Sequence, residues 1–577
     1  MFLFPIAASL LAIVFSLFLA RKIKATPSGS GKIIDISQTI QEEAKAYLKK
    51  QYQTIGLVSF FIFVILCLAI NFKAALGFLL GVIFSALIGY LGMMVSSQAN
   101  PKVVEAAKKG LDPSLKLAFR SGAAIGFLVV GMGLLAVSGF YFLFKDLDAL
   151  VALGFGGSLT SVFSRLGNGI FSKTAAINAN LVGKAKKDIP DDDSRNLITI
   201  AALVGNNVND CVGSVADLFE TYVVTLVAAM LLGHLLFINQ VAVFLPLILA
   251  SMGIFASIPV TFLVKIGGKM NIIAAFYKAL LGAVLFVTIG FFPALKELAG
   301  SLDISFVNLY LLSFLGLMIV VAIFFAAERA PTKKYNSLGS IASASETENK
   351  ENVIHGLMRR TRSTILLVIL ICIGILISFS LAGLYGLTVT SLVMFSLIEM
   401  IVSFAVFGSI ADNTLAIAEA VGLPAEVCET TAALDTVGNI MKTVTKIYAL
   451  VSTVLASLIL FYAYIQEIRD RGLMIQFLLD DYKVLTGLFL GGLVPSVFAR
   501  MVTGTKKMII PALTPILIPI LTAIILGPKG LAGLLIGTIV SGLIELGDFP
   551  KGVAGLTISP PIKTLNVVAL LIVSFLV

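Results

Sequence analysis

The sequence lacks tryptophan, has two histidines and four cysteines, and is poor in charge. With His234 and His355 alone, histidine-based catalysis and histidine-ligated metal sites are disfavoured. The cysteines are far apart in the sequence: Cys67, Cys211, Cys372 and Cys428. This spacing indicates neither a disulfide framework nor a zinc site. Charged residues make up 13% and hydrophobic residues 58%, which excludes an ordinary soluble enzyme, a disordered chain and a fibre. The composition predicts a polytopic membrane protein.

Long apolar runs are abundant, and a run of about 20 residues can cross the hydrocarbon core as a helix. The sequence therefore predicts an all-α transmembrane helix bundle of about 16 spans. The runs lie near residues 2–20, 55–72, 76–97, 121–144, 148–171, 198–232, 235–264, 272–294, 305–327, 364–384, 387–411, 439–465, 484–503, 508–526, 530–547 and 564–577. Arg21, Lys22 and Lys24 follow the first run in place of a small-residue cleavage site, so we expect an uncleaved anchor.

Basic residues alternate between the gaps that separate these runs. The first, third, fifth and ninth gaps hold many Lys and Arg residues, whereas the second, fourth, sixth and tenth hold one or none. The positive-inside rule then predicts that odd-numbered gaps face the cytoplasm and that both termini face outward. The twelfth gap, with Arg469, Arg471 and Lys483, is an exception. Topology accounts for most of the net charge of +10, so no nucleic-acid partner is expected.

The polar, Ser- and Asn-rich segment near residues 328–362 is the one plausible linker. We expect it to be cytoplasmic and to join nine-span and seven-span halves of one membrane-integral domain, residues 1–577. No convincing sequence repeat relates the halves. Compact loops and the lack of a transit-like leader suggest a multi-pass protein of a bacterial or archaeal cell membrane.

The sixth run contains acidic and amide side chains. At about 100° per residue, Asn206, Asp210 and Asp217 fall within about 40° of one another, and Glu220 lies near the same edge. Ionisable groups within a span are costly and usually face a bundle interior. Buried polar residues satisfied by neighbouring helices are one interpretation. Two aspartates and one glutamate on one stripe favour the other, a hydrated cavity or ion route.

A second acidic region lies between the eleventh and twelfth runs. Asp435 and Asn439 form an i, i+4 pair, Lys442 and Lys446 extend the same stripe, and Asp412 abuts the membrane. Carboxylates hold hard cations and ammonium groups hold phosphate oxygens, so the pattern suits a metal-bound anion. A solvated cytoplasmic loop stays open as an alternative for these residues. It is favoured for the other acids of the gap, Glu419, Glu426 and Glu429.

The fifth gap combines lysines with an acidic run. Lys173 and Lys184 could neutralise an anion, whereas Asp191, Asp192 and Asp193 follow a proline, as solvated turns often do. The segment has no Gly-x-x-x-x-Gly-Lys motif, so an ATP-driven pump is not supported.

Most of the chain resembles the membrane-integral pyrophosphatases, which couple pyrophosphate hydrolysis to export of H⁺ or Na⁺. The resembling segments include IQEEAKAYLKKQYQTI (40–55), GNGIFSKTAAINANLVGKAKKDIPDDDSRN (167–196), VADLFETY (215–222) and FGSIADN to KTVTKIYA (407–449). The resemblance implies sixteen spans, a homodimer in a lipid bilayer, and a cytoplasmic site where acids hold several Mg²⁺ ions around pyrophosphate.

The resemblance also implies roles for particular residues. The implied metal ligands are Asp210, which is also the catalytic residue, Asp412, Asp435 and Asn439. The implied binding residues for pyrophosphate or phosphate are Lys173, Lys184, Lys442 and Lys446. Lys442 and Thr445 resemble the potassium-insensitive, H⁺-pumping subclass, in which a lysine replaces the potassium ion. The implied ion gate is Arg165, Asp217, Glu220 and Lys563, and a purely structural ion-pair cluster is the alternative.

The chain departs from the family at many site positions. The family has aspartates at the positions of Ala176, Asn180, Ala202, Asn206, Ala405 and Ala432, and a glutamate at Lys186. A Trp-Asp-Asn-Ala-Lys-Lys-like segment is absent, and the final motif is reduced to GDFPKGVAGLTISPP, with Asp548 and Lys551 as remnants. Replacing Asp by Ala or Asn removes ligand charge for Mg²⁺, so electrostatic stabilisation of phosphoryl transfer should suffer.

Three functional hypotheses follow, in order of preference. The first is a divergent pyrophosphatase homologue with hydrolysis and pumping weakened or lost. The second is an active pyrophosphate-energised proton pump that has rebuilt its site from Asp191 to Asp193, Glu545 and Asp548. The third is a magnesium-independent anion-binding or transport protein that uses its surplus lysines. The sequence leaves open which ion is moved, whether the chain pairs with an intact paralogue, and in which membrane it resides.

Overall fold

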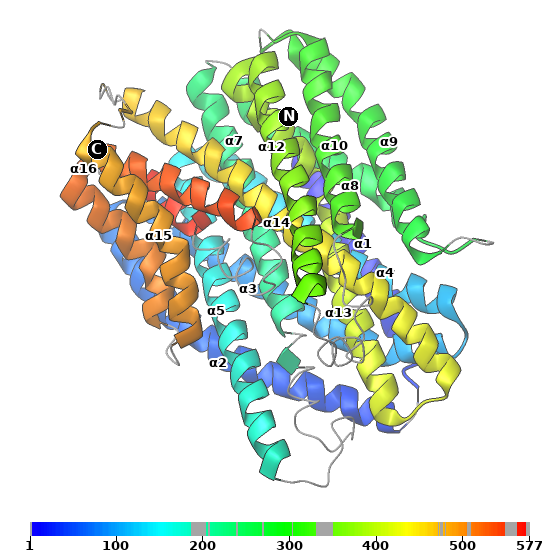
Figure 1. Cartoon of the computed structure of the whole chain (residues 1–577). Helices are drawn as coiled ribbons and strands as arrows, with labels where there is room; N and C mark the ends of the chain where they lie inside the picture. Colours follow the sequence, from blue (N-terminus) through cyan, green and yellow to red (C-terminus); the bar gives the residue numbers. More distant parts are fainter. Residues whose placement is uncertain are drawn as a thin grey trace.

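The computed structural model describes most of the chain as helices. The described residues are 3–29, 31–185, 204–205, 208–237, 240–267, 271–302, 304–329, 350–470, 472, 477–478, 480–504, 509–547 and 562–572. Within these residues every regular element is helical, which confirms the predicted all-α class. Thirteen helices in this part are long and apolar enough to cross a membrane, and Tyr482–Pro495 and Ile562–Ile572 are shorter apolar helices. The predicted multi-pass architecture is confirmed (Figure 1).

The helices follow one another through short connections. The first group is α1 (Leu3–Lys24), α2 (Lys32–Ala69), α3 (Phe72–Ala107), α4 (Leu111–Phe144) and α5 (Leu147–Ala185). The π-helix η1 (Asn209–Gly213) leads into α7 (Ser214–Leu236), α8 (Gln240–Val260), α9 (Ile272–Ala299) and α10 (Phe306–Arg329). The remaining helices are α12 (Lys350–Phe395), α13 (Ile398–Val421), α14 (Ala425–Asp470), α15 (Tyr482–Gly504), α16 (Ile509–Gly547) and the unlabelled helix Ile562–Ile572.

Backbone breaks explain why the predicted runs and the helices do not match one to one. Gly527 in α16 has a φ of 69° and separates the fourteenth run from the fifteenth. Gly383 in α12 has a φ of 56°, at the end of the tenth run. These φ values suit glycine, which has no Cβ to clash. The eleventh run is divided by a break at residues 396–397, between α12 and α13. With these breaks counted, the structure is close to the predicted sixteen spans.

Tyrosines of α14 are bonded beside two of these breaks. The hydroxyl of Tyr448 donates to the carbonyl of Met394, 3.1 Å away and just before the break at residues 396–397. The hydroxyl of Tyr464 donates to the carbonyl of Pro528, 2.8 Å away and next to Gly527. A buried hydroxyl usually finds such a partner because an unpaired one is costly.

The predicted linker lies mainly outside the described residues. Helix α10 continues to Arg329, residues 330–349 are not described, and Lys350 begins α12. Part of the expected linker is therefore helical. The organisation as one domain stays a prediction.

The bundle has an inner and an outer set of helices. The apolar stretch of α7 is 100% buried, whereas those of α2 and α12 are 22% buried, so α7 lies at the centre and the other two lie at the periphery. Inner helices approach closely through glycine, as membrane helices often do. An added Cβ at Gly81 of α3 would lie 2.0 Å from the carbonyl oxygen of Leu153 on α5.

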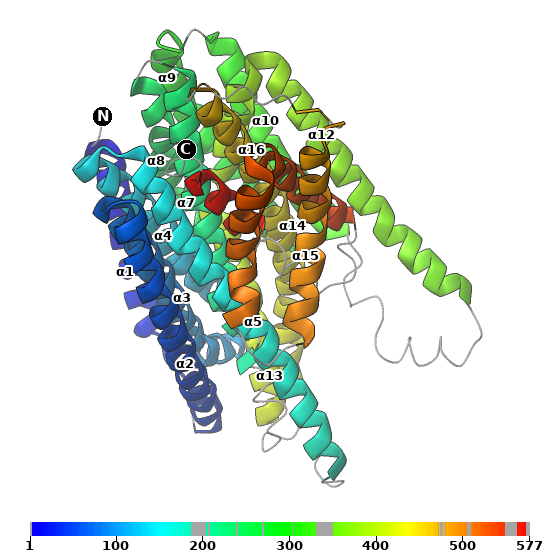
Figure 2. The same cartoon turned by 90° about the vertical axis from the view of Figure 1, so that its left-hand side faces the viewer.

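Several predicted cytoplasmic gaps meet at one end of the bundle. Lys102 Nζ donates to the carbonyls of Ile23, Lys24 and Thr26, which joins the third gap to the first. The backbone N–H of Ile266 donates to Asp112 Oδ1 at 2.8 Å, which joins the seventh gap to the third. The α13–α14 connection and the C-terminal part of α5 lie at the end opposite the start of α1 (Figures 1 and 2). The arrangement agrees with the alternation of charge, and the side on which the termini lie stays a prediction.

Candidate functional site

The predicted gate residues form one buried cluster within the bundle. Arg165 comes from α5, Asp217 and Glu220 from α7, and Lys563 from the helix Ile562–Ile572, and none is more than 3% exposed. Arg165 Nη2 donates to Asp217 Oδ2 at 2.7 Å, and Lys563 Nζ donates to the other oxygen, Asp217 Oδ1. Lys563 Nζ also lies 3.2 Å from Glu220 Oε2. Two acids and two bases in contact offset part of the cost of burying each charge.

Hydroxyl groups complete this cluster. Ser158 Oγ donates to Glu220 Oε1 at 2.5 Å, and Lys563 donates to Thr221 Oγ1. Arg165 Nη1 donates to Ser214 Oγ at 3.4 Å. Arg165, Glu220 and Lys563 therefore each have a hydroxyl neighbour as well as an ionic one, which suits a buried network. The ion-gate role of these four residues stays a prediction.

The stripe predicted along the sixth run is not a regular α-helical face. Residues Asn209–Gly213 form a π-helix, in which each turn holds more residues than in an α-helix. The uniform 100° spacing used in the prediction therefore fails across this turn, and that part of the prediction is wrong. Asp217 and Glu220 both follow the π-helix and share a face as expected. Asn206 lies outside the described residues, and Asp210 is described by its backbone alone.

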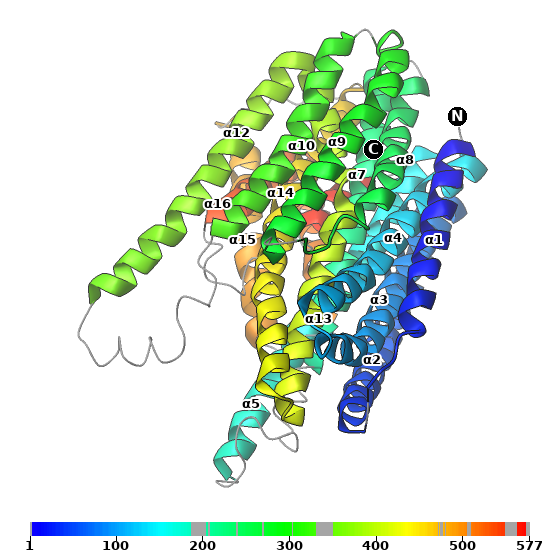
Figure 3. The same cartoon turned by 90° about the vertical axis from the view of Figure 1, so that its right-hand side faces the viewer.

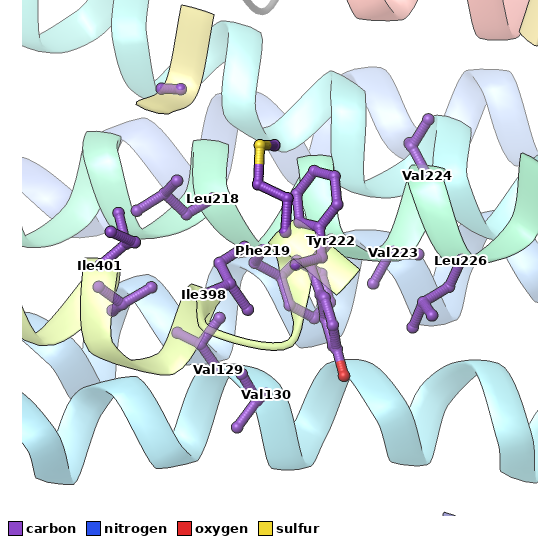
Figure 4. Close-up of a cluster of buried hydrophobic side chains, with 14 of the residues drawn as sticks. Val129, Val130, Leu218, Phe219, Tyr222, Val223, Val224, Leu226, Ile398 and Ile401 are labelled. Carbon is purple, nitrogen blue, oxygen red and sulfur yellow. The ribbon is translucent and has the colours of Figure 1, made fainter. Parts of the chain in front are cut away.

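An apolar layer covers another side of α7. Phe219 and Tyr222 of α7 pack with Ile398 and Ile401 of α13, and Val129 of α4 lies beside them (Figure 4). All these side chains are buried.

The second candidate region lies between α13 and α14. Lys442 Nζ of α14 donates to Asp412 Oδ2 of α13 at 3.1 Å. One turn earlier in α14, Asn439 Nδ2 donates to the backbone carbonyl and to Oδ2 of Asp435, both at 3.0 Å. The predicted i, i+4 pair is confirmed, and the structure adds the ion pair between the helices. The side chains of Lys442 and Asp412 are 13% and 30% exposed, so this pair is far wetter than the buried cluster.

Two glycines bring α13 and α14 close enough for this pair to form. An added Cβ at Gly408 would lie 2.6 Å from Lys442 Cγ and 2.7 Å from the carbonyl oxygen of Gly438. No such distance is tolerated between real atoms, so the backbone of α13 approaches α14 only because residue 408 has no side chain. Lys442 passes over this glycine to Asp412.

The acidic end of α14 lies outside the hydrocarbon core. The helix has 46 residues, and at 1.5 Å per residue it is roughly 69 Å long, more than twice the thickness of about 30 Å. Its apolar run begins at residue 439, after Asp435. Burial raises the pKa of Asp435 to about 6, Asp412 and Glu419 act in the same direction, and Lys442 and Asn439 oppose them. A carboxyl with a raised pKa is a weaker metal ligand because the metal must displace its proton.

The described side chains do not fit a centre of several magnesium ions. Within the described residues, no group of three or more His, Cys, Asp or Glu side chains is placed to hold a metal ion. Of the implied carboxylate ligands, the structure describes the side chains of Asp412 and Asp435 in this region. Asp412 already forms an ion pair with Lys442. Ala405 and Ala432, on α13 and α14, offer no ligand.

The other predicted site residues are placed less fully. Lys173 and Lys184 lie on the C-terminal part of α5 and are described by backbone alone. Lys446 is half-buried one turn after Lys442, and Thr445 donates to the carbonyls of Ile401 and Met441. Lys186, Asn206, Asp548, Lys551 and the run Asp191 to Asp193 lie outside the described residues.

Sequence reasoning missed Glu399, an acid in the first turn of α13 that is 4% exposed. Ser403 Oγ donates to Glu399 Oε1 at 3.0 Å, and Ser257 of α8 lies close to the same carboxyl. Within the described residues no basic side chain forms an ion pair with it. The sequence did contain a signal, because Glu399 lies inside the eleventh apolar run. Ionisable residues within a span are functional candidates in the sixth run, and the same rule would have selected this glutamate. The break before α13 adds a helix N-terminus, which favours an acid there.

Comparisons with known proteins agree on one family. The family model described as inorganic H⁺ pyrophosphatase matches residues 10–505. A K(+)-insensitive pyrophosphate-energized proton pump of Methanosarcina mazei is 37% identical over 591 residues, which covers 93% of this chain and 87% of that protein. A pump of the same description from Moorella thermoacetica, numbered 2, is 34% identical over 488 residues, or 81% and 71% of the two chains. A putative K(+)-stimulated pyrophosphate-energized sodium pump of Clostridium tetani is 31% identical over 600 residues, or 92% and 85%.

Proposed function

Because the chain belongs to the H⁺ pyrophosphatase family of membrane-integral ion pumps, we propose that it is a divergent member in which magnesium-dependent hydrolysis of pyrophosphate is weakened or lost. Ion pumping, which hydrolysis drives in the family, is then weakened or lost as well. The observation that supports this proposal is the small number of implied carboxylate ligands on the facing parts of α13 and α14. There, Asp412 is paired with Lys442, and Ala405 and Ala432 provide no ligand.

The chemistry of phosphoryl transfer makes this loss serious. Pyrophosphate is strongly anionic, and Mg²⁺ held by carboxylates would neutralise it and stabilise the charge that develops during transfer. Preorganised electrostatic stabilisation is usually the largest single contribution to such a rate. The two implied carboxylate ligands that the structure describes here, one of them bonded to a lysine, give a weak negative field for assembling several magnesium ions. Asp210 would then act as a base with few of the acids that surround its counterpart in the family.

One observation favours a second candidate, an active proton pump with a rebuilt site. The cluster of Arg165, Asp217, Glu220 and Lys563 keeps all four charged residues, joined by three ion pairs. Asp191 to Asp193, Glu545 and Asp548 are the acids that could replace the lost ligands. Lys442 and Thr445 point to H⁺ and to potassium independence in this case. A homodimer that binds pyrophosphate or phosphate is part of both candidates.

Phosphate release from pyrophosphate distinguishes the two candidates. Purified, detergent-solubilised chain is assayed with and without Mg²⁺, beside the Asp210→Ala variant as the matched control. The first candidate predicts no turnover above that control. Helical circular dichroism and a cooperative thermal transition would show that the assayed protein is folded. Turnover that needs both Mg²⁺ and Asp210 would establish a rebuilt site and overturn the proposal. Proton uptake into vesicles would then be measured.

A further inference from the structure

A cavity of about 570 Å³ opens where α1 and α3 end and α4 begins, on the predicted cytoplasmic side. Its lining is strongly basic, with a single acid, Glu105. The basic lining residues are Lys22, Lys102, Lys109, Lys116 and Arg120. Leu19, Leu117 and Phe262 give it an apolar floor. Cations over an apolar floor are suited to a ligand with a charged end and a hydrocarbon end.

Two of the cations have structural roles. Lys102 Nζ donates to three carbonyls at the end of α1, at 2.7 to 2.9 Å. Lys116 forms an ion pair with Asp112, and the acid Glu105 forms one with Lys108 at 2.7 Å. These groups hold the three helix ends together, and the positive charge of Lys102 stays in the cavity without a carboxylate to balance it.

The other three cations are available to a ligand. Within the described part of the chain, Lys22, Lys109 and Arg120 form no ion pair with a carboxylate. Lys22 Nζ lies 4.4 Å from the centre of the Phe18 ring, and the Arg120 guanidinium carbon lies 5.6 Å from that of Phe262. Ring contacts of this kind orient a cation while its N–H groups can still donate to an anion.

An apolar path leads from the cavity along the outside of the bundle. Phe18 and Phe262 at its edge are 43% and 42% exposed, and Val14 and Phe255 continue the path at 61% and 44%. Phe15 of α1 contacts the ring of Phe262 in the turn after α8, and Phe4 stacks on Phe255 of α8, so α1, α8 and this turn form one aromatic surface. The two helices lie side by side with α4 on the flank shown in Figure 3. In a bilayer these exposed apolar side chains would be accessible to lipid tails.

We propose that this cavity binds the headgroup of an anionic phospholipid of the cytoplasmic leaflet. The phosphate accepts hydrogen bonds from Lys22, Lys109 and Arg120, and one acyl chain lies along Phe18 and Phe262. Basic pockets between membrane helices on the cytoplasmic side suit anionic headgroups in this way. Free phosphate would meet the same cations but would leave the apolar path uncovered. The proposal does not depend on whether the chain hydrolyses pyrophosphate.

The test uses the full chain, purified in mild detergent and stripped of lipid, with the triple variant Lys22→Gln, Lys109→Gln and Arg120→Gln. The matched control changes three exposed lysines of α2 on the same predicted side: Lys32→Gln, Lys49→Gln and Lys50→Gln. Each protein receives dioleoyl-phosphatidylglycerol, dioleoyl-phosphatidylcholine or inorganic phosphate. Bound lipid is counted by native mass spectrometry, and the melting temperature is followed in parallel.

We expect phosphatidylglycerol to bind and to raise the melting temperature, and phosphatidylcholine and phosphate to do neither. Apparent affinity for phosphatidylglycerol should fall about tenfold in the triple variant and stay within about twofold in the control. Added salt should weaken binding because it screens the lysines. Equal binding by the two variants would overturn the proposal. Protection by inorganic phosphate equal to that by the lipid would overturn it in favour of a soluble anion site. If the triple variant does not fold, Arg120→Gln alone is compared with Lys49→Gln.

Discussion

Acidic and basic side chains form ion pairs in two regions of this protein. The two regions differ in how much stability the protein should lose when one charge is removed. In the buried cluster, Asp217 lies between Arg165 and Lys563, and no member is more than 3% exposed. Between α13 and α14, Asp412 and Lys442 are partly in contact with solvent. Removing one charge from a dry cluster leaves its partners unpaired, whereas a wet site can lose carboxylates at little cost in stability. The need for a stable fold is therefore enough to keep all four charged residues of the buried cluster. Their presence is weak support for active pumping.

The largest test of this comparison is the change of one acid to its amide in each region. Asp217→Asn leaves two buried cations with one acid, so the free energy of unfolding should fall by about 3–5 kcal/mol. Asp412→Asn removes an ion pair in a wetter place and should cost about 0.2–1 kcal/mol. Thermal and denaturant unfolding in detergent would measure both. Equal losses for the two variants would contradict the comparison.

A smaller effect is expected at the glycine that joins α13 to α14. Gly408→Ala places a methyl group 2.6 Å from Lys442 Cγ and against the backbone of α14, so separating the helices should cost about 1–3 kcal/mol. The control is Gly56→Ala in α2, where an added Cβ meets nothing within 4 Å. There the loss of backbone entropy in the unfolded chain should stabilise the protein by about 0.5–1 kcal/mol. The unfolding midpoints of the two variants should move in opposite directions.

The smallest change in stability is expected for Glu399→Gln, and whether this change is a loss or a gain is informative. Glu399 is as dry as the buried cluster but has no cationic partner among the described residues. Glu399→Gln keeps an oxygen that accepts from Ser403 and removes an acid that is costly to ionise, so stability should change by less than about 1 kcal/mol or rise. The same acid-to-amide change at Asp217 should be strongly destabilising. A large loss at Glu399 would show that its carboxylate has a partner of its own.

The sequence was sufficient for features that depend on composition and local spacing. Apolar runs predicted the helical bundle, and the i, i+4 spacing predicted the bond between Asn439 and Asp435. Lys563 is 346 residues from Asp217, so only the family resemblance could bring the two together in a prediction. The ion pair between Lys442 and Asp412 depends on the close approach of α13 and α14 at Gly408. Residue spacing along a single helix cannot predict such an approach between two helices. The break before α13 is equally invisible to hydropathy, because the residues on both sides remain apolar. Hydropathy also does not distinguish the π-helix before α7 from an ordinary helical turn. The break at Gly527 in α16, by contrast, coincides with the gap predicted between the fourteenth and fifteenth runs.

Helix α14 connects these observations mechanically. It holds Asp435 and Lys442 at one end, and its Tyr448 and Tyr464 bond to the chain beside the two breaks, at Met394 and Pro528. A helix is stiff along its axis, so a displacement at its solvent-exposed end would reach both breaks at once. Sliding by a fraction of the pitch of about 5.4 Å would load both tyrosine bonds together. Because both tyrosines lie on one helix, any axial displacement of α14 would strain both contacts together, whichever end of the helix moved first.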